Sequence, residues 1–381
     1  MRIIVSVKGK FHAFYLARAL MKKDKLHRLL TSYPSYDVKR YDIPVHKIKS
    51  LVIVGAIERL WNAMPALVKS GSENDYHLAE LYDIIASRYI DKADIFIGWS
   101  SFSLRCMRKA RNLGAKIIIE RGSSHILYQQ SILKEESLLL GVCPPKMSAR
   151  IIKKELKEYE EADYIEVPSS FAKRTFLDYG IDEKKLITGL IGVDTREFSS
   201  IAKRDGVFRI IYCGTLSIRK GVHYLLEAFF NTNLPDAELW LIGHMEDEMR
   251  PFIKKYYNEK VLHVGPLKQK ELYKYYSQGS VLVLMSIEDG FGQVILQAMS
   301  CGLPVICTNH TGGPDIVREG VDGFILSIRD VKSLQEKITY LYENPRACAE
   351  MGQNALRRAH DTFAWDKLID KISALYDDCA K

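Results

Sequence analysis

The segment 287–306 constrains the fold most strongly. In it, Glu288 and Asp289 precede a Gly-Phe-Gly turn, one short helical pattern and a buried strand. Glycines let backbone N–H groups approach a ligand closely, and the positive end of the following helix faces the same place. We therefore predict a phosphate site here, with the polar side chain of Gln297 about two turns into the helix. The backbone of this predicted phosphate site is formed by Gly290, Phe291, Gly292 and Gln293.

Short apolar runs alternate with amphipathic helical patterns through most of the chain. This alternation predicts an α/β fold in which parallel sheets are covered by helices on both faces. Ligands of such sheets bind outside the carboxyl ends of the strands. We predict strands at 2–7, 94–98, 115–119, 164–167, 208–213, 237–242, 260–263, 281–285 and 303–307.

The chain of 381 residues is long for one domain and fits two of ordinary size. A polar stretch at 199–206 separates the two series of strands, so the junction is expected at about 190–206. We predict an N-terminal domain at 1–195 and a C-terminal domain at 196–362, with the ligand cleft between them. A last helical pattern occupies 363–381.

The segment 287–306 resembles the donor-nucleotide signature of retaining glycosyltransferases of the GT-B fold, in particular glycosyltransferase family 4. That signature has a carboxylate before Gly-Phe-Gly and a second one after seven intervening residues; here Asp289 and Gln297 stand there. The resemblance implies that Asp289, or its neighbour Glu288, is catalytic beside the transferred sugar, and that Gln297 binds the ribose. A glutamine keeps the hydrogen bonds but lacks the charge of a carboxylate. The alternative is a capped surface helix.

The resemblance also implies two Rossmann-like, doubly wound domains that face each other across a cleft. The N-terminal domain binds the acceptor and the C-terminal domain binds the nucleotide sugar. The helix at 363–381 is expected to cross back and pack on the N-terminal domain.

A second loop, 213–221, supplies the cations that a diphosphate needs. Arg219 and Lys220 stand at a helix start, where cations oppose the helix dipole unless an anion lies between. Arg can bind a diphosphate through two parallel hydrogen bonds. Related enzymes carry Gly-Arg-Leu in this loop; Thr215 replaces that Arg here, and we expect Arg219 to supply its charge. The alternative is a solvated basic helix start.

The remaining candidate residues lie in loops at other strand ends. In the loop 8–12, we predict that the backbone at Gly9 approaches the diphosphate and that Lys10 supplies a positive charge. The alternative is an ordinary turn with solvated lysines. By resemblance, His125 contacts the donor sugar and is a catalytic candidate, although a lone histidine also fits a purely structural hydrogen-bonding role. The resemblance further assigns His12, Glu120 and Arg121 to the vicinity of the sugar or acceptor, and Gly214, Gly265 and Leu267 to the ribose or base.

The activity implied is transfer of a sugar, with retention, from a UDP- or GDP-linked donor to a hydroxyl of a glycan or lipid-linked acceptor. Bacterial surface polysaccharide synthesis is the usual setting of such chains. No cofactor and no metal are expected, because basic side chains can neutralise the leaving diphosphate and no Asp-x-Asp triplet is present. Three alternatives stay open: a phosphorylase or a nucleotide-sugar epimerase on the same fold, and a non-catalytic nucleotide-sugar-binding subunit.

The net charge of +8 suits anionic partners, and no nucleic-acid-binding motif is present. Seven scattered cysteines without a Cys-x-x-Cys pair favour reduced thiols and a cytoplasmic protein. The N-terminal run reads as a first buried strand and not as a signal peptide. Segment 44–72 allows two interpretations: a basic amphipathic surface that rests on the anionic inner face of a membrane, or a pair of core-facing helices.

Overall fold

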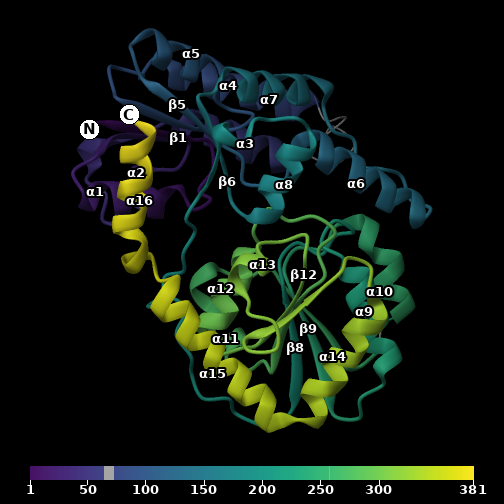
Figure 1. Cartoon of the computed structure of the whole chain (residues 1–381). Helices are drawn as coiled ribbons and strands as arrows, with labels where there is room; N and C mark the ends of the chain where they lie inside the picture. The colour runs from purple at the N-terminus through teal and green to yellow at the C-terminus, as the bar shows by residue number, and fades with distance from the viewer. Residues whose placement is uncertain (64–72, 257) are drawn as a thin grey trace.

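The computed structural model describes residues 1–63, 73–256 and 258–381. Two sheets, each with its own helical cover, lie one above the other in Figure 1. The strands pair in parallel throughout both sheets. This arrangement confirms the α/β class with two doubly wound domains.

The N-terminal sheet has seven strands in the order β3-β2-β1-β4-β5-β6-β7. The central strands consist almost wholly of buried apolar residues, as expected for strands that are covered on both faces. The strands are β1 (Ile3–Val7), β2 (Leu26–Thr31), β3 (Ile48–Ser50), β4 (Ile95–Trp99), β5 (Lys116–Glu120), β6 (Tyr164–Val167) and β7 (Leu186–Thr188).

The C-terminal sheet has six strands in the order β10-β9-β8-β11-β12-β13. The reversal of strand order beside β8 and β11 is the switch point at which such sheets bind ligands. The strands are β8 (Phe208–Cys213), β9 (Ala237–Ile242), β10 (Val261–Gly265), β11 (Val281–Leu284), β12 (Val305–Thr308) and β13 (Gly323–Leu326).

Helices follow the strands in chain order. The N-terminal domain contains α1 (Ala13–Lys22), α2 (Ser35–Val38), α3 (Val52–Ala63), α4 (Glu73–Ser87), α5 (Leu104–Asn112), α6 (Ile126–Leu139), α7 (Ala149–Glu161) and α8 (Ser170–Asp178). The rest are α9 (Val222–Thr232), α10 (Arg250–Tyr256), α11 (Leu272–Tyr276), α12 (Gln293–Ser300), α13 (Gly313–Ile316), α14 (Val331–Glu343), α15 (Pro345–Thr362) and α16 (Trp365–Cys379). Short 3-10 turns are η1 (Lys39–Tyr41), η2 (Val45–Lys47), η3 (Glu183–Lys185), η4 (Asp247–Met249) and η5 (Gln269–Glu271).

All nine predicted strands are present, with ends shifted by no more than a few residues. Four further strands, β2, β3, β7 and β13, have no counterpart in the prediction. β3 and β7 are only three residues long, β2 carries His27 and Arg28 in its first half, and β13 begins with Gly323. None of these has the continuous apolar run by which a buried strand is found in sequence.

The last helix returns to the first domain, as predicted. α16 packs on α1 and lies beside α1 and α2 in Figure 1, after α15 has run along the C-terminal domain. Trp365 stacks on Tyr15 with ring centroids 5.2 Å apart and planes 5° from parallel. Lys22 and Lys25 of the first domain form ion pairs with Asp366 and Asp377 of α16. α16 therefore ties the C-terminal domain to the first domain beside the interdomain segment, where Val193 forms a bridge to Ala364.

Segment 44–72 contains η2, β3 and α3, while 64–72, including Lys69, lie outside the described residues. α3 buries Val54 completely and contacts α4, so one face of the helix packs in the core. Val52, Ile53, Ile57 and Leu60 remain exposed on the same helix. Among the described residues no helix has both the length and the apolarity needed to cross a bilayer.

Candidate active site between the two domains

A cavity of about 460 Å³ lies between the domains at the carboxyl ends of the central strands. Its N-terminal wall comes from the loops after β1, β4 and β5, and its C-terminal wall from the loops after β8 and β11. Residues that line the N-terminal side of the cavity include His12, Trp99, Glu120, Arg121, Ser123 and Gln129. Residues that line its C-terminal side include Arg219, Asp289, Phe291, Gly292 and Gln293.

Glu288 joins the two walls. Its carboxylate is fully buried and accepts a hydrogen bond from Arg219 Nε at 2.8 Å. The other donors lie across the cleft: Ser123 Oγ at 2.6 Å, Ser124 Oγ at 2.8 Å, the Ser124 amide at 3.1 Å and Gln129 Nε2 at 2.8 Å. Burial alone would raise the pKa of Glu288, but the charge of Arg219 and these hydrogen bonds hold it well below the usual 4.5. The carboxylate therefore stays ionised and engaged.

On the C-terminal wall, Asp289 is an acidic residue that faces the cavity. Lys220 Nζ lies 2.5 Å from its Oδ2, and both side chains keep partial exposure, 18% and 16%. The sequence left open whether Glu288 or Asp289 faces a donor sugar. Because all the hydrogen-bonding capacity of Glu288 is directed at protein groups, Asp289 is the acid whose position suits contact with a ligand.

The N-terminus of α12 adds further positive potential beside Asp289. Gly292 caps this helix in the left-handed conformation, with φ 75°, and no acidic residue lies in its first turn. The N-terminus of α12 and the guanidinium of Arg219 thus border the cleft on one side, an arrangement that favours an anion.

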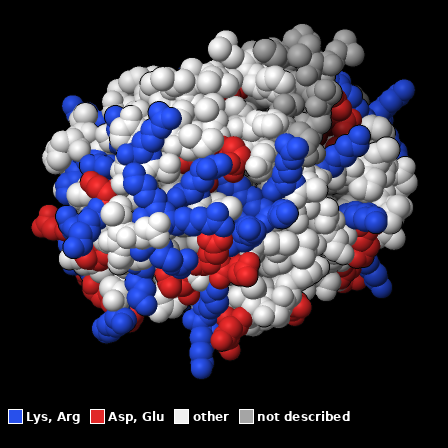
Figure 2. All heavy atoms as spheres, turned by 90° about the horizontal axis from the view of Figure 1, so that it is seen from above, with Lys and Arg blue, Asp and Glu red and all other residues white. Residues whose placement is uncertain are grey.

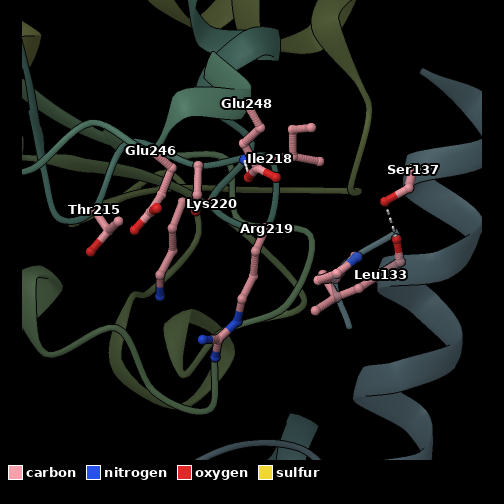
Figure 3. Close-up of a pocket in the computed structure, with 10 residues that line it drawn as sticks. Leu133, Ser137, Thr215, Ile218, Arg219, Lys220, Glu246 and Glu248 are labelled. Atoms are coloured by element: carbon pink, nitrogen blue, oxygen red, sulfur yellow. Dashed lines mark hydrogen bonds between the residues drawn. The ribbon is translucent and has the colours of Figure 1, made fainter. Parts of the chain in front are cut away.

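The β8–α9 loop borders a second cavity of about 330 Å³ that faces α6. Figure 3 shows Arg219 and Lys220 extending from the loop to one side, with Leu133 and Ser137 on α6 across the cavity. Thr215 lines the same cavity, and Arg219 lines both cavities. Arg219 and Thr215 thus border the same cavity.

Gly221 fixes how closely this loop approaches the acidic loop. It has φ 63°, and a Cβ there would lie 1.8 Å from the carbonyl oxygen of Met285. We expect Gly221→Ala to destabilise the protein by about 2–3 kcal/mol, since backbone strain and a backbone clash add. Gly114→Ala is the matched control, because Gly114 has φ 90° with open space around it, and should cost about 1 kcal/mol. Urea unfolding of the two variants measures the difference; equal losses would contradict the close approach.

On the N-terminal wall, His12 and Glu120 lie together, with His12 Nε2 3.1 Å from Glu120 Oε1. Arg121 is held by its own loop and by α6 and α7: it donates to the carbonyl of Ser124, to Gln129 Oε1 and to Glu155 Oε1. The structure brings these three predicted residues to the same cavity as Arg219 and Asp289.

Several predicted residues lie elsewhere. His125 is buried at the N-cap of α6, where Nδ1 accepts from the Leu127 amide at 3.3 Å and the ring stacks on Tyr179. Burial, together with the charge of Arg121, lowers the pKa of His125 to about 4. His125 does not line the cavity, so its contacts are those of a structural histidine and not of a sugar-binding one.

Gly9 and Lys10 also lie apart from the diphosphate candidates. Gly9 borders a separate hollow beside α3, and Lys10 Nζ donates to Gln269 Oε1 at 2.9 Å. Lys10 is thus directed to the loop after β10 and not to Arg219.

The ribose and base candidates lie in the C-terminal domain, outside the cleft cavity. Gln297 is 7% exposed and accepts from Tyr276 OH at 3.1 Å. Gly214 follows β8 and Gly265 ends β10, both with positive φ, and Leu267 packs against the core.

Three residues of the site had no place in the sequence prediction: Ser123, Gln129 and Trp99. Ser123 is part of the Gly-Ser loop that carries His125, and Gln129 lies one helical turn beyond His125. Only the pairing of this loop with Glu288, 159 or more residues away along the chain, gives these side chains their role. Trp99 ends a buried strand and reads as core in the sequence.

Residues 193–358 match the model of the family described as glycosyl transferases group 1. The chain is 28% identical over 176 residues to the capsular polysaccharide biosynthesis glycosyltransferase CapM of Staphylococcus aureus, a match that covers 45% of this chain and 46% of CapM. The chain spans about half the length of the curated relatives it matches.

Solved structures match over the full length. The sucrose-phosphate synthase of Thermosynechococcus elongatus has a TM-score of 0.75 at 17% identity and covers 99% of this chain and 98% of its own. HepE of Anabaena, solved in complex with UDP-glucose, has a TM-score of 0.71 at 15% identity and covers 99% of this chain and 100% of its own. At these identities the likeness shows the fold.

Two facing parallel domains, a cleft at their strand ends and a helix that crosses back define the GT-B fold. By this fold and by the match of its C-terminal half, the chain is similar to the GT-B glycosyltransferases, and glycosyltransferase family 4 is consistent with both.

Proposed function

We propose that this protein transfers a sugar from a nucleotide-diphosphate donor to a hydroxyl of a glycan or lipid-linked acceptor, with retention and without a divalent metal. The observation that carries the proposal is that Arg219 and the N-terminus of α12 border a cleft that also contains Asp289, the ion-pair partner of Lys220. Positive groups fixed in this way stabilise the negative charge that develops on a leaving diphosphate.

In the donor complex, Lys220 and the α12 amides hold the diphosphate, while Asp289 lies beside the sugar. Arg219 is tied to Glu288 and adds positive potential from the rear of the site. Gln297 and the loops at Gly214 and Gly265 serve the ribose and base on the C-terminal side. A UDP donor has the support of HepE, which was solved with UDP-glucose, and GDP remains the second candidate.

Surface polysaccharide synthesis is the proposed setting, and the name of CapM supports it. We further propose a cytoplasmic location, with contact to the inner face of a membrane. Figure 2 shows Lys and Arg side chains gathered across the middle of the molecule as seen from above, interspersed with Asp and Glu. The exposed apolar residues of α3 suit the same contact.

Calorimetric titration with UDP and with GDP tests the donor site. We expect one of the two to bind, and the corresponding nucleotide sugars to raise the melting temperature. Release of nucleotide that depends on an added acceptor then separates transfer from phosphorolysis or epimerisation. Failure of both nucleotides to bind would remove the proposal.

A further inference from the structure

A cavity of about 750 Å³ lies apart from the cleft cavity, between α1 and η1 of the first domain and the loop after β10 of the second. No residue that the structure describes lines both cavities. The walls of the larger one come from residues 10–42, from the segment 194–197 between the domains, and from residues 268–270. A ligand in this cavity therefore touches both domains and the segment that joins them.

Positive charge predominates on the walls of this cavity. Six cationic side chains stand there against three carboxylates: Lys10, Arg18, Arg40, Arg196, Lys268 and Lys270 against Asp42, Asp194 and Glu197. Two of the carboxylates are engaged by protein groups. Asp194 pairs with Arg196 at 3.3 Å, and Glu197 accepts hydrogen bonds from Tyr15 OH at 3.2 Å and from Gln269 Nε2 at 2.8 Å.

The three lysines have no acidic partner within the described part of the chain. Lys10 Nζ donates to the neutral side chain of Gln269 at 2.9 Å. Lys268 and Lys270 are exposed, and their ammonium groups form neither an ion pair nor a hydrogen bond with any described residue. The remaining acid, Asp42, is exposed at the end of η1 and offsets only part of their charge. The surplus positive charge of the cavity suits an anion.

Arg18 indicates what kind of anion fits. Its side chain is buried, with 6% of the residue exposed, yet its acidic neighbours are distant: Asp366 Oδ1 at 3.5 Å and Asp194 Oδ2 at 3.7 Å. Only the first of these contacts is a hydrogen bond, and it is a long one. A guanidinium group has five N–H donors, so Arg18 keeps donors without a close acceptor among the described residues. An anion in the cavity that Arg18 lines can accept two parallel hydrogen bonds from it, as a phosphate group does.

We propose that this cavity binds a multiply charged phosphate compound, a phosphate ester or a diphosphate, at a site separate from the donor cleft. Arg18 binds the phosphate oxygens from the buried side, and Lys10, Lys268 and Lys270 neutralise the remaining charge. The volume falls within the range of about 300–1,000 Å³ that is usual for small-molecule sites, so an organic group fits beside the phosphate. Because Lys10 and the other two lysines belong to different domains, the bound anion stabilises the relative position of the domains.

Inorganic pyrophosphate is the first probe, with sodium chloride adjusted to keep the ionic strength constant. Calorimetry is carried out on the wild type and on Lys220→Ala, in which the proposed donor site lacks its lysine. We expect pyrophosphate to bind both proteins, and to raise the melting temperature by about 3–5 °C at roughly 100 times its Kd. Loss of all pyrophosphate binding in Lys220→Ala would place the anion in the donor site and overturn the proposal.

A double variant, Lys268→Ala with Lys270→Ala, tests the site itself. Both positions are exposed, so the variant should fold, and its affinity for pyrophosphate should fall about 10-fold. The matched control is Lys157→Ala with Lys332→Ala, which removes the same charge from exposed positions of α7 and α14 and should leave the affinity unchanged. Equal losses in the two double variants would show an effect of net charge alone and overturn the proposal.

Two further probes distinguish the sources of the phosphate group. Glucose 1-phosphate represents a free phosphate ester, and vesicles of phosphatidic acid in phosphatidylcholine represent a lipid headgroup. The probe whose binding weakens in Lys268→Ala with Lys270→Ala identifies the source. If none of the three probes binds in a way that depends on these lysines, the proposal is wrong. Calorimetry with UDP on the same samples reports the donor site independently, so failure of this inference and failure of the proposed function give different results.

Discussion

Lys220→Ala is expected to lower the rate of sugar transfer, as kcat/KM, by about 10²–10³-fold. Lys220 is the one proposed diphosphate cation whose ammonium group is tied only to a partly exposed carboxylate, that of Asp289. A bound diphosphate can replace Asp289 as the partner of the Lys220 ammonium group, and no buried ion pair is broken when it does. UDP affinity should fall with the rate, since a hydrogen bond to a charged group contributes about 1.5–3 kcal/mol. Steady-state kinetics and calorimetry measure both effects.

Two controls separate the charge of Lys220 from the ion pair that it forms. Asp289→Asn removes the same ion pair but keeps the cation, so UDP alone should bind with nearly wild-type affinity. Lys332→Ala removes an exposed lysine on α14 and should change neither rate nor affinity. The diphosphate assignment is wrong if Lys220→Ala behaves like Lys332→Ala.

Glu288→Ala is expected to destabilise the protein by about 3–5 kcal/mol, the usual effect of breaking a buried ion pair. The change leaves Arg219 without its partner and leaves donors of Ser123, Ser124 and Gln129 unsatisfied in a buried place. Because those donors belong to the N-terminal domain, the contact between the domains weakens as well. Denaturant unfolding, followed by tryptophan fluorescence, measures the loss. Glu343→Ala, on an exposed position of α14, is the control and should cost less than about 0.5 kcal/mol.

The pH dependence of stability in a second variant, Glu288→Gln, gives another readout. The pKa of Glu288 is lowered in the folded protein, so its stabilisation is fully present above the unfolded value of 4.5 and is lost as pH falls through the lower folded value. The stability difference between wild type and Glu288→Gln should therefore be constant from pH 7 to about pH 5 and shrink below pH 4.5. A difference that grows on acidification would contradict an ionised Glu288.

The sequence predicted the fold well because the central strands are buried on both faces and appear as unbroken apolar runs. Of the residues predicted for the C-terminal site, Arg219, Asp289, Phe291, Gly292 and Gln293 do line the cleft, and all of them lie within two short loops. The N-terminal wall was harder. His125 lies on a strand-end loop that looks functional, yet its ring is taken up by helix capping and aromatic packing. Which of two neighbouring polar residues faces a cavity depends on packing across the cleft, which one loop cannot specify.

Glu288 shows the same limit in another form. In the sequence, Glu288 stands next to Asp289 and is an alternative to it for contact with the donor sugar. In the structure, Glu288 instead joins the two walls of the cleft. Its partners come from residues 123–129, and only the approach of the two domains places them around a single carboxylate. A position of this kind is invisible to local pattern, because its hydrogen bonds all depend on tertiary structure.

The return of α16 sets how the protein can be divided in an expression experiment. A cut between the domains in sequence, near residue 200, leaves the helix that covers α1 attached to the wrong half. The N-terminal half then exposes Tyr15 and the lysines that α16 pairs with, and the C-terminal half carries α16 with its apolar face uncovered. Independent production of the donor half should end near residue 362, and the acceptor half should receive residues 365–379 as a fused segment. A circular permutant joins the two chain ends, which lie on the same domain, and so keeps α16 packed on α1. The chain can then be opened in the segment between the domains.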